Sequence, residues 1–215
     1  MENITPKEKI LKKIRAGLLY KKKNPFPDLD LESNVFRVDD DNLVNLFAQK
    51  ITENSGHFIY CHNYYDFVDT YLSLVERDVF NHIVCLEPEI VKSLNETGIN
   101  TDNLPGFNKE KPDAAISSCE ALVARNGSIL LSSLKNHRTP WINTHVHIVL
   151  AYRSQLVYDI KDAFLILKNK YGSKLPSSLF FVSGPAKTAD IEAKVILTSQ
   201  GPEKVFVFLI DDQSK

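Results

Sequence analysis

Short apolar runs alternate with amphipathic segments along most of this chain, and this alternation limits the possible fold more than any other feature. The runs occupy residues 57–61, 82–86, 114–116, 146–150, 179–182 and 205–210. Each run is too short for a helix and is apolar at consecutive positions, which is typical of strands buried on both faces. The pattern therefore predicts an α/β protein with a largely parallel sheet flanked by helices.

The segments between these runs carry helix signals. Apolar side chains recur at helical spacing within residues 43–51, 64–75 and 160–171. The aspartates at 39–41 can cap the first of these helices, while Asn63, Pro88 and Asp159 suit the starts of others. We also expect a short helix at residues 119–124 and a further helix at residues 189–198.

A separate helical segment is predicted at the N-terminus. Its start has the residues of a capping box with proline in the first helical position: Thr5, Pro6 and Glu8. Residues 1–23 carry eight Lys and Arg against two Glu, and residues 24–41 carry six Asp and Glu against one Arg. Such a segment is either an arm that docks to a partner or a helix whose lysines face water. We divide the chain into residues 1–38, an N-terminal helix with an acidic connector, and residues 39–215, an α/β domain.

The overall composition excludes several classes of protein. Lys and Arg number 26 against 27 Asp and Glu, so the chain as a whole is no polyanion binder. With 43% hydrophobic residues it is too apolar for a disordered protein. No apolar run approaches the roughly 18–20 residues that span a bilayer, and the N-terminus lacks a signal-peptide pattern. We therefore expect a cytoplasmic protein.

The cysteines and histidines give little support for a metal site. Cys61, Cys85 and Cys119 are far apart, and no C-x-x-C occurs, so neither a disulfide framework nor an iron–sulfur or zinc site built by this chain is expected. Alternation places His145 and His147 on one face of a strand, a spacing that can bind metal. Two histidines without a further Cys or carboxylate favour a core or rim histidine instead. We predict no metal and no cofactor in this chain.

The main candidate for a binding site is the stretch S-G-P-A-K-T-A-D-I-E at residues 183–192. An apolar run leads into this stretch, and a helix is predicted to begin near Thr188. We therefore expect a strand-to-helix turn. In an open parallel sheet such a turn lies at the carboxyl edge, where ligands bind. Gly184 lets backbone amides approach a ligand, while Ser183, Lys187 and Thr188 add hydroxyls and positive charge. These residues predict a site for a phosphate or a carboxylate.

An alternative interpretation assigns the same residues to the predicted helix alone. In it, Thr188 caps the helix, Asp190 and Glu192 complement the helix dipole, and Lys187 faces water. The stretch is not a P-loop, because the pattern G-x-x-x-x-G-K-[ST] is absent.

The decapeptide also resembles a family signature. Together with Gly201, Pro202 and the apolar run at 205–210, it is similar to the closing signature of the LUD domain, the lactate-utilisation protein C (LutC) family. Two upstream blocks agree in order and spacing: residues 114–131 and the V-H-I-V at 146–149. The resemblance extends from about residue 114 to the C-terminus. It adds four candidate residues of the ligand site: Arg125, Gly127, Ser128 and His147.

This resemblance implies a fold similar to the sugar-phosphate isomerase and CoA-transferase superfamily (NagB/RpiA/CoA transferase-like). It further implies a cluster-free accessory subunit of a system that oxidises lactate to pyruvate, with an iron–sulfur protein and a cysteine-rich protein as partners. The iron–sulfur clusters would then belong to those partners, and this chain would bind a small anionic ligand. Two alternatives are a stand-alone isomerase- or CoA-transferase-like enzyme acting on a phosphorylated or acyl substrate, and a non-catalytic binding module.

Two departures from the family pattern bear on catalysis. The glutamate of the family's E-T-G-T turn is Arg125 here, and the histidine of its H-G-P is Gln200. Both groups can transfer protons, so their loss leaves no catalytic residue to assign. Arg125, beside Gly127, can instead enlarge an anion site.

Overall fold

The computed structural model describes residues 5–19, 25–28, 30, 42–78, 80–99, 101, 111–134, 141–189, 195–197 and 201–213. The aspartates at 39–41 and the candidates Asp190, Glu192 and Gln200 lie outside these residues. The chain divides into two units, Met1–Arg37 and Val38–Lys215. Each unit is described by itself.

The described part of the N-terminal unit contains helix α1 (Pro6–Leu19). The predicted capping box is present, because the Thr5 amide and hydroxyl both donate to Glu8 Oε2, at 2.8 and 2.9 Å. The Glu8 amide donates in return to Thr5 Oγ1 at 3.3 Å. No residue of α1 is buried.

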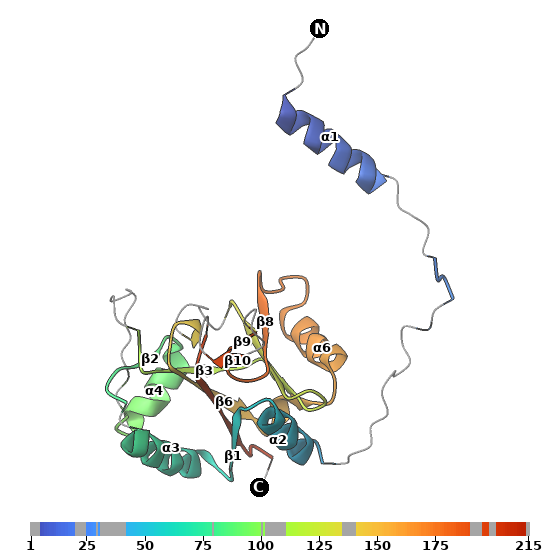
Figure 1. The fold of residues 1–215 in the computed structure, drawn as a ribbon. Helices are drawn as coiled ribbons and strands as arrows, with labels where there is room; N and C mark the ends of the chain where they lie inside the picture. The colour runs from blue at the N-terminus through green and yellow to red at the C-terminus, as the bar shows by residue number, and fades with distance from the viewer. Residues whose placement is uncertain are drawn as a thin grey trace. The chain divides into compact units, whose positions relative to one another are not determined.

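A parallel five-stranded sheet is the centre of the second unit and confirms the predicted α/β class (Figure 1). Its described strands neighbour one another in the order β1 (His57–Cys61), β11 (Lys204–Ile210), β6 (Val146–Tyr152), β3 (Ala114–Ser118) and β2 (Ile83–Cys85). His57 lies opposite Phe206, and Val146 lies opposite both Lys204 and Ala114. The sheet therefore has one edge made of amino ends and one made of carboxyl ends.

Four helices of the second unit begin at or near the predicted residues: α2 (Leu43–Glu53), α3 (Tyr64–Asp78), α4 (Pro88–Glu96) and α6 (Ile160–Tyr171). Asn63 and Asp159 accept from backbone amides at the starts of α3 and α6. The cap of α2 is Asn42, which accepts from the amides of Val44 and Asn45 at 3.2 and 3.3 Å. A short 3₁₀ turn, η1 (Arg153–Gln155), follows β6.

A second, four-stranded sheet was not predicted. It has the order β7 (Leu156–Val157), β4 (Ala121–Val123), β5 (Ser128–Ser132) and β8 (Leu179–Val182), with β4 antiparallel to β5 and β5 antiparallel to β8. The helix expected at residues 119–124 is therefore wrong. Ala121 and Val123 pack with α6 while Leu122 packs toward the other sheet, so the segment is apolar on both faces and lacks a strand's usual alternation.

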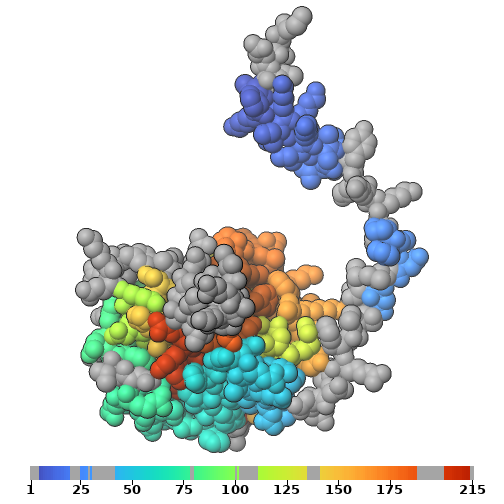
Figure 2. All heavy atoms as spheres, viewed as in Figure 1, coloured from blue at the N-terminus to red at the C-terminus, as the bar shows by residue number. Residues whose placement is uncertain are grey.

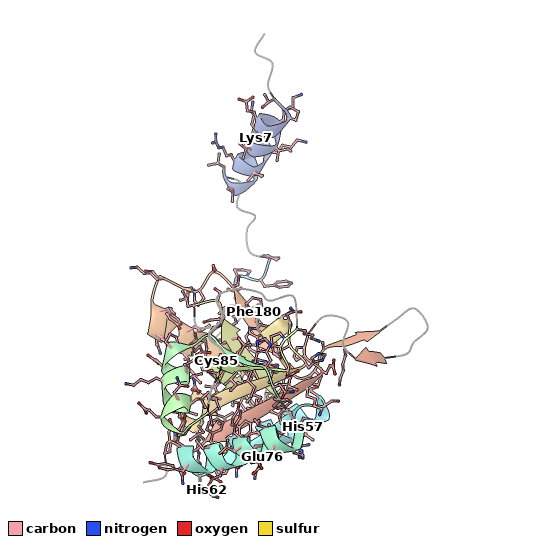
Figure 3. All side chains as sticks on the ribbon, turned by 90° about the vertical axis from the view of Figure 1, so that its left-hand side faces the viewer. Lys7, His57, His62, Glu76, Cys85 and Phe180 are labelled. Atoms are coloured by element: carbon pink, nitrogen blue, oxygen red, sulfur yellow. The ribbon has the colours of Figure 1, made fainter. Side chains whose placement is uncertain are left out.

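The helix expected at residues 189–198 is also wrong for the part that the structure describes. Strand β9 (Lys187–Ala189) pairs antiparallel with β10 (Val195–Leu197), and Ala189 lies opposite Val195. The β-branched pair Val195 and Ile196 favours a strand. This hairpin stands out to the side of both sheets (Figure 3).

The core consists of three apolar layers. Helices α3 and α4 cover one face of the parallel sheet, and the second sheet and α2 cover the other. Helix α6 packs on the outer face of the second sheet. On the face drawn in Figure 2, α2 and α3 form the lower part of this unit. No helix within the described residues is long and apolar enough to cross a membrane.

Candidate functional site

The described part of the stretch, residues 183–189, lies at the amino edge of the parallel sheet, so the expected position at the carboxyl edge is wrong. Strand β8, which precedes the stretch, belongs to the second sheet. Lys187 Nζ donates to the hydroxyl of Ser55, two residues before β1 begins, at 3.0 Å. The Ala186 amide donates at 3.0 Å to the carbonyl of Pro202, which precedes β11. Both contacts place the stretch beside the first residues of parallel strands.

The structure brings two of the resembling blocks together at this edge. The hydroxyls of Ser128 and Ser183 are 2.7 Å apart. Ser128 opens β5, and its amide donates to Asn126 Oδ1 at 3.3 Å. The Asn126 carbonyl accepts from Asn54 Nδ2 at 3.1 Å, which connects the turn to the end of α2. Residues far apart in sequence therefore form one polar cluster with Lys187 and Ser55 nearby.

Gly127 and Gly184 allow this cluster to form against α2. Gly127 has φ +66°, and a Cβ there would lie 2.6 Å from the amide nitrogen of Ile51. Gly184 has φ +151°, and a Cβ there would lie 2.5 Å from the carbonyl oxygen of Asn54. Each glycine therefore lies against the backbone at the end of α2. Only a residue without a Cβ can approach that backbone so closely.

Lys187, Ser55, Ser128 and Ser183 supply the chemistry for an anion at this edge, because an exposed ammonium and three hydroxyls can all donate hydrogen bonds. Of Thr188 the structure describes only the backbone, in β9, and Asp190 and Glu192 lie outside the described residues. The cluster that can be described therefore contains Ser183, Gly184 and Lys187 from the decapeptide.

Arg125 has a partner of its own. Its Nε and Nη2 both donate to Asp159 Oδ1, at 3.1 and 2.8 Å, and its amide donates to the Tyr158 carbonyl. Asp159 is also the cap of α6. The guanidinium therefore anchors the start of α6 to the β4–β5 turn.

His147 lies inside the core between the two sheets. Its Nε2 is 2.8 Å from the Ser117 hydroxyl, and its ring stacks on Trp141 with centroids 5.5 Å apart. Complete burial lowers the pKa of His147 to about 3, so the imidazole is neutral near pH 7. Within the part of the chain that the structure describes, the buried atoms His147 Nδ1 and Trp141 Nε1 have no hydrogen-bond partner.

His145 does not share a strand face with His147, contrary to the expected alternation. Strand β6 begins only at Val146, and the half-exposed His145 ring lies 2.7 Å from Glu203 Oε1. Within the described residues, no three or more His, Cys, Asp or Glu side chains are placed to hold a metal ion.

A second polar cluster, at the carboxyl edge, was missed by sequence reasoning. Glu87 follows β2, and its carboxylate accepts from the Ser118 amide at 2.7 Å and from the Ser118 hydroxyl at 2.5 Å. From β2 the chain continues to α4 on one face of the sheet, and from β3 it continues to β4 on the other. Adjacent strands that lead to opposite faces mark the place where open α/β sheets bind ligands.

The same edge holds a buried aspartate. Asp211 directly follows β11, and its side chain is 1% exposed. It accepts from the Tyr60 hydroxyl and, at 3.0 Å, from Arg153 Nη1. The hydrogen bond to Asp211 raises the pKa of Tyr60, so the phenol stays protonated. The signal in the sequence is a polar residue at the end of an apolar run: Glu87 and Asp211 directly follow their runs, and Ser118 follows its run by two residues.

Comparison with known proteins supports the resemblance found in the sequence. Residues 108–210 match the family model described as the LUD domain. This part of the chain is similar to a LUD domain. The match includes Arg125, Gly127, Ser128 and Lys187.

Two curated relatives of the chain carry the same name. Lactate utilization protein C of Bacillus licheniformis is 27% identical over 107 residues, which are 48% of this chain and 45% of that protein. Lactate utilization protein C of Oceanobacillus iheyensis is 30% identical over 105 residues, 47% of this chain and 45% of that protein. The matched region spans about half the length of these relatives.

One solved structure shares the fold. It is the crystal structure of a DUF162 family protein from Deinococcus radiodurans, with a TM-score of 0.60 and 14% sequence identity. The similarity covers 78% of this chain and 96% of that one. At this identity it supports the α/β architecture alone.

Proposed function

We propose that this chain is a lactate-utilisation protein that works with iron–sulfur partner proteins and binds a small anion at the amino-edge cluster. The observation that carries the proposal is the LUD match over residues 108–210, together with relatives named lactate utilization protein C. Lactate and pyruvate are both small carboxylates, which suit a site of ammonium and hydroxyl donors.

The cysteines support the assignment of iron–sulfur clusters to partners. Cys61, Cys85 and Cys119 are all buried, and burial raises the pKa of Cys61 and of Cys85 to about 12. Cluster ligands are thiolates, whereas the thiols of Cys61 and Cys85 hold their protons near pH 7. The clusters that lactate oxidation would use therefore belong to other proteins in this proposal.

The anion site is tested by titrating the full chain with L-lactate, pyruvate and inorganic phosphate in a calorimeter. We expect one of these anions to bind, and Lys187→Ala to weaken its binding by about 1–3 kcal/mol, roughly 5- to 150-fold, because one charge-assisted contact is lost. Lys168→Ala, which removes an exposed lysine of α6, is the matched control and should leave binding unchanged. Absence of binding by wild type for all three anions would reject the site.

A second candidate is a stand-alone enzyme that acts on a phosphorylated or acyl substrate at the carboxyl edge. The contact between Glu87 and Ser118, where neighbouring strands lead to opposite faces, favours it. Unaided turnover of a sugar phosphate or an acyl-CoA, abolished by Glu87→Gln and retained by Lys187→Ala, would establish this enzyme and replace the accessory role.

A further inference from the structure

Helix α1 has an apolar side whose side chains are exposed. Ile10 is 60% exposed, Ile14 53% and Leu18 71%. With Leu11 they fall on one side of the helix at spacings of three and four residues. An isolated helix of 14 residues is marginally stable in water, so a surface that covers this side would stabilise it.

Basic residues flank the apolar side, and Lys7 lies within it in the first turn, three residues before Ile10. Lys9 and Lys13 lie on one flank of the apolar side, and Arg15 lies on the other. Residues 1–37 have nine Lys and Arg against five Asp and Glu, eight of these cations lying in residues 1–23, whereas residues 38–215 have 17 against 22. Positive charge is therefore concentrated in the N-terminal unit, and the α/β unit has the opposite sign.

We propose that α1 binds an anionic lipid surface, with Ile10, Ile14 and Leu18 in the boundary between headgroups and acyl chains and the lysines at the lipid phosphates. An amphipathic helix with about four to eight Lys and Arg has the composition that binds anionic membranes in this way. The inference goes beyond the proposed function and does not depend on it.

Two features favour a lipid surface over a groove on another protein. The apolar side consists of aliphatic side chains, whereas the energetic centres of protein interfaces are enriched in Trp and Tyr. Cations on both flanks of that side fit an extended negative surface. The stretch from Leu19 to Asp28 can reach up to about 30 Å, which exceeds the Debye length of about 10 Å at 0.1 M salt, so the acidic residues after it do not cancel the attraction.

Sedimentation of the full chain with vesicles tests the proposal. We expect binding to phosphatidylcholine vesicles that contain a quarter phosphatidylglycerol, at 50 mM salt, and at least tenfold weaker binding to pure phosphatidylcholine. The triple variant Ile10→Ser/Ile14→Ser/Leu18→Ser keeps the charge and should lose binding at least tenfold. So should Lys9→Gln/Lys12→Gln/Lys13→Gln, which keeps the apolar side.

Each triple variant has a matched control in the α/β unit. Leu134, Leu165 and Leu175 are exposed to a similar degree, and their replacement by serine should leave vesicle binding unchanged. Replacement of the exposed Lys92, Lys168 and Lys174 by glutamine removes the same charge and should have no effect either. No binding by wild type, or binding that survives the serine variant of α1, would overturn the proposal. If the wild type is a dimer that does not bind vesicles, and the serine variant of α1 is a monomer, the apolar side binds a second copy of the chain instead.

Discussion

Single buried polar residues hold the second sheet to its neighbours. The side chain of Glu120 is fully buried and accepts from the hydroxyls of Ser132 and Tyr171, at 2.6 and 2.7 Å, and from Lys170 Nζ at 2.8 Å. These partners lie on β5 and α6, so one carboxylate connects the sheet to the helix that covers it. Loss of such a carboxylate leaves buried donors without an acceptor.

We predict that Glu120→Ala lowers the free energy of unfolding by about 3 kcal/mol, because the hydroxyls of Ser132 and Tyr171 lose their acceptor in the interior. Urea denaturation measures this change. Ser177→Ala is the control, because its hydroxyl is 3.1 Å from Ser133 in an exposed pair, and its effect should stay within about 0.5 kcal/mol. Equal effects of the two variants would show that the Glu120 network does not stabilise the fold.

His147 predicts a dependence of stability on pH. In the unfolded chain a histidine titrates near pH 6.5, whereas burial lowers the pKa of His147 to about 3 in the folded state. Between these values only the unfolded chain binds the proton. The free energy of unfolding should therefore fall as pH falls from 6.5 toward 3, by up to about 1.4 kcal/mol per pH unit.

Urea denaturation between pH 4.5 and 7.5 measures this slope. His147→Gln removes the titrating group and should flatten the slope by about 1.4 kcal/mol per pH unit relative to wild type. His62→Gln changes an exposed histidine and is the control. If His147→Gln and His62→Gln have the same slope, His147 is protonated in the folded protein and the prediction fails.

The elements show what local sequence can predict. Helices α2, α3, α4 and α6 have periodic apolar positions and clear starts, and sequence alone found all four. Strand β4 was predicted as a helix because its residues pack on α6 on one side and on the parallel sheet on the other. The β9–β10 hairpin was also missed. A short apolar run such as Val195–Leu197 does not show by itself which segment of the chain it will pair with.

At the same scale, the packing of α2 depends on Gly127. We predict that Gly127→Ala lowers the free energy of unfolding by about 2–4 kcal/mol, because the added Cβ would lie 2.6 Å from the backbone of α2 in addition to the strain at φ +66°. Gly172→Ala is the matched control, since Gly172 has φ +58° and nothing within 4 Å of an added Cβ. It should cost about 1 kcal/mol. Equal losses in urea denaturation would mean that α2 moves aside freely.

For the molecule as a whole, sequence predicted the α/β class and named Ser128, Ser183 and Lys187 of the amino-edge cluster, but it predicted neither Ser55 nor where that cluster lies. Six apolar runs were assigned to one sheet, while the fold places 179–182 in a second sheet. Hydrophobicity shows that a strand is buried and does not show which sheet buries it. For this reason the decapeptide was expected at the carboxyl edge, and Ser183 lies beside Ser128 at the amino edge instead.

The division of the chain into two units leads to a last prediction, concerning removal of residues 1–37. No residue of α1 is buried, so the α/β unit should lose little packing when Met1–Arg37 are absent. We expect the free energy of unfolding to change by less than about 0.5 kcal/mol, while binding to phosphatidylglycerol vesicles is lost. Trp141 is the single tryptophan and lies in the core, so its fluorescence reports unfolding of the α/β unit in both proteins. A truncated chain less stable by more than about 1 kcal/mol would show that the N-terminal unit packs on the α/β unit, and its apolar side would then already be covered.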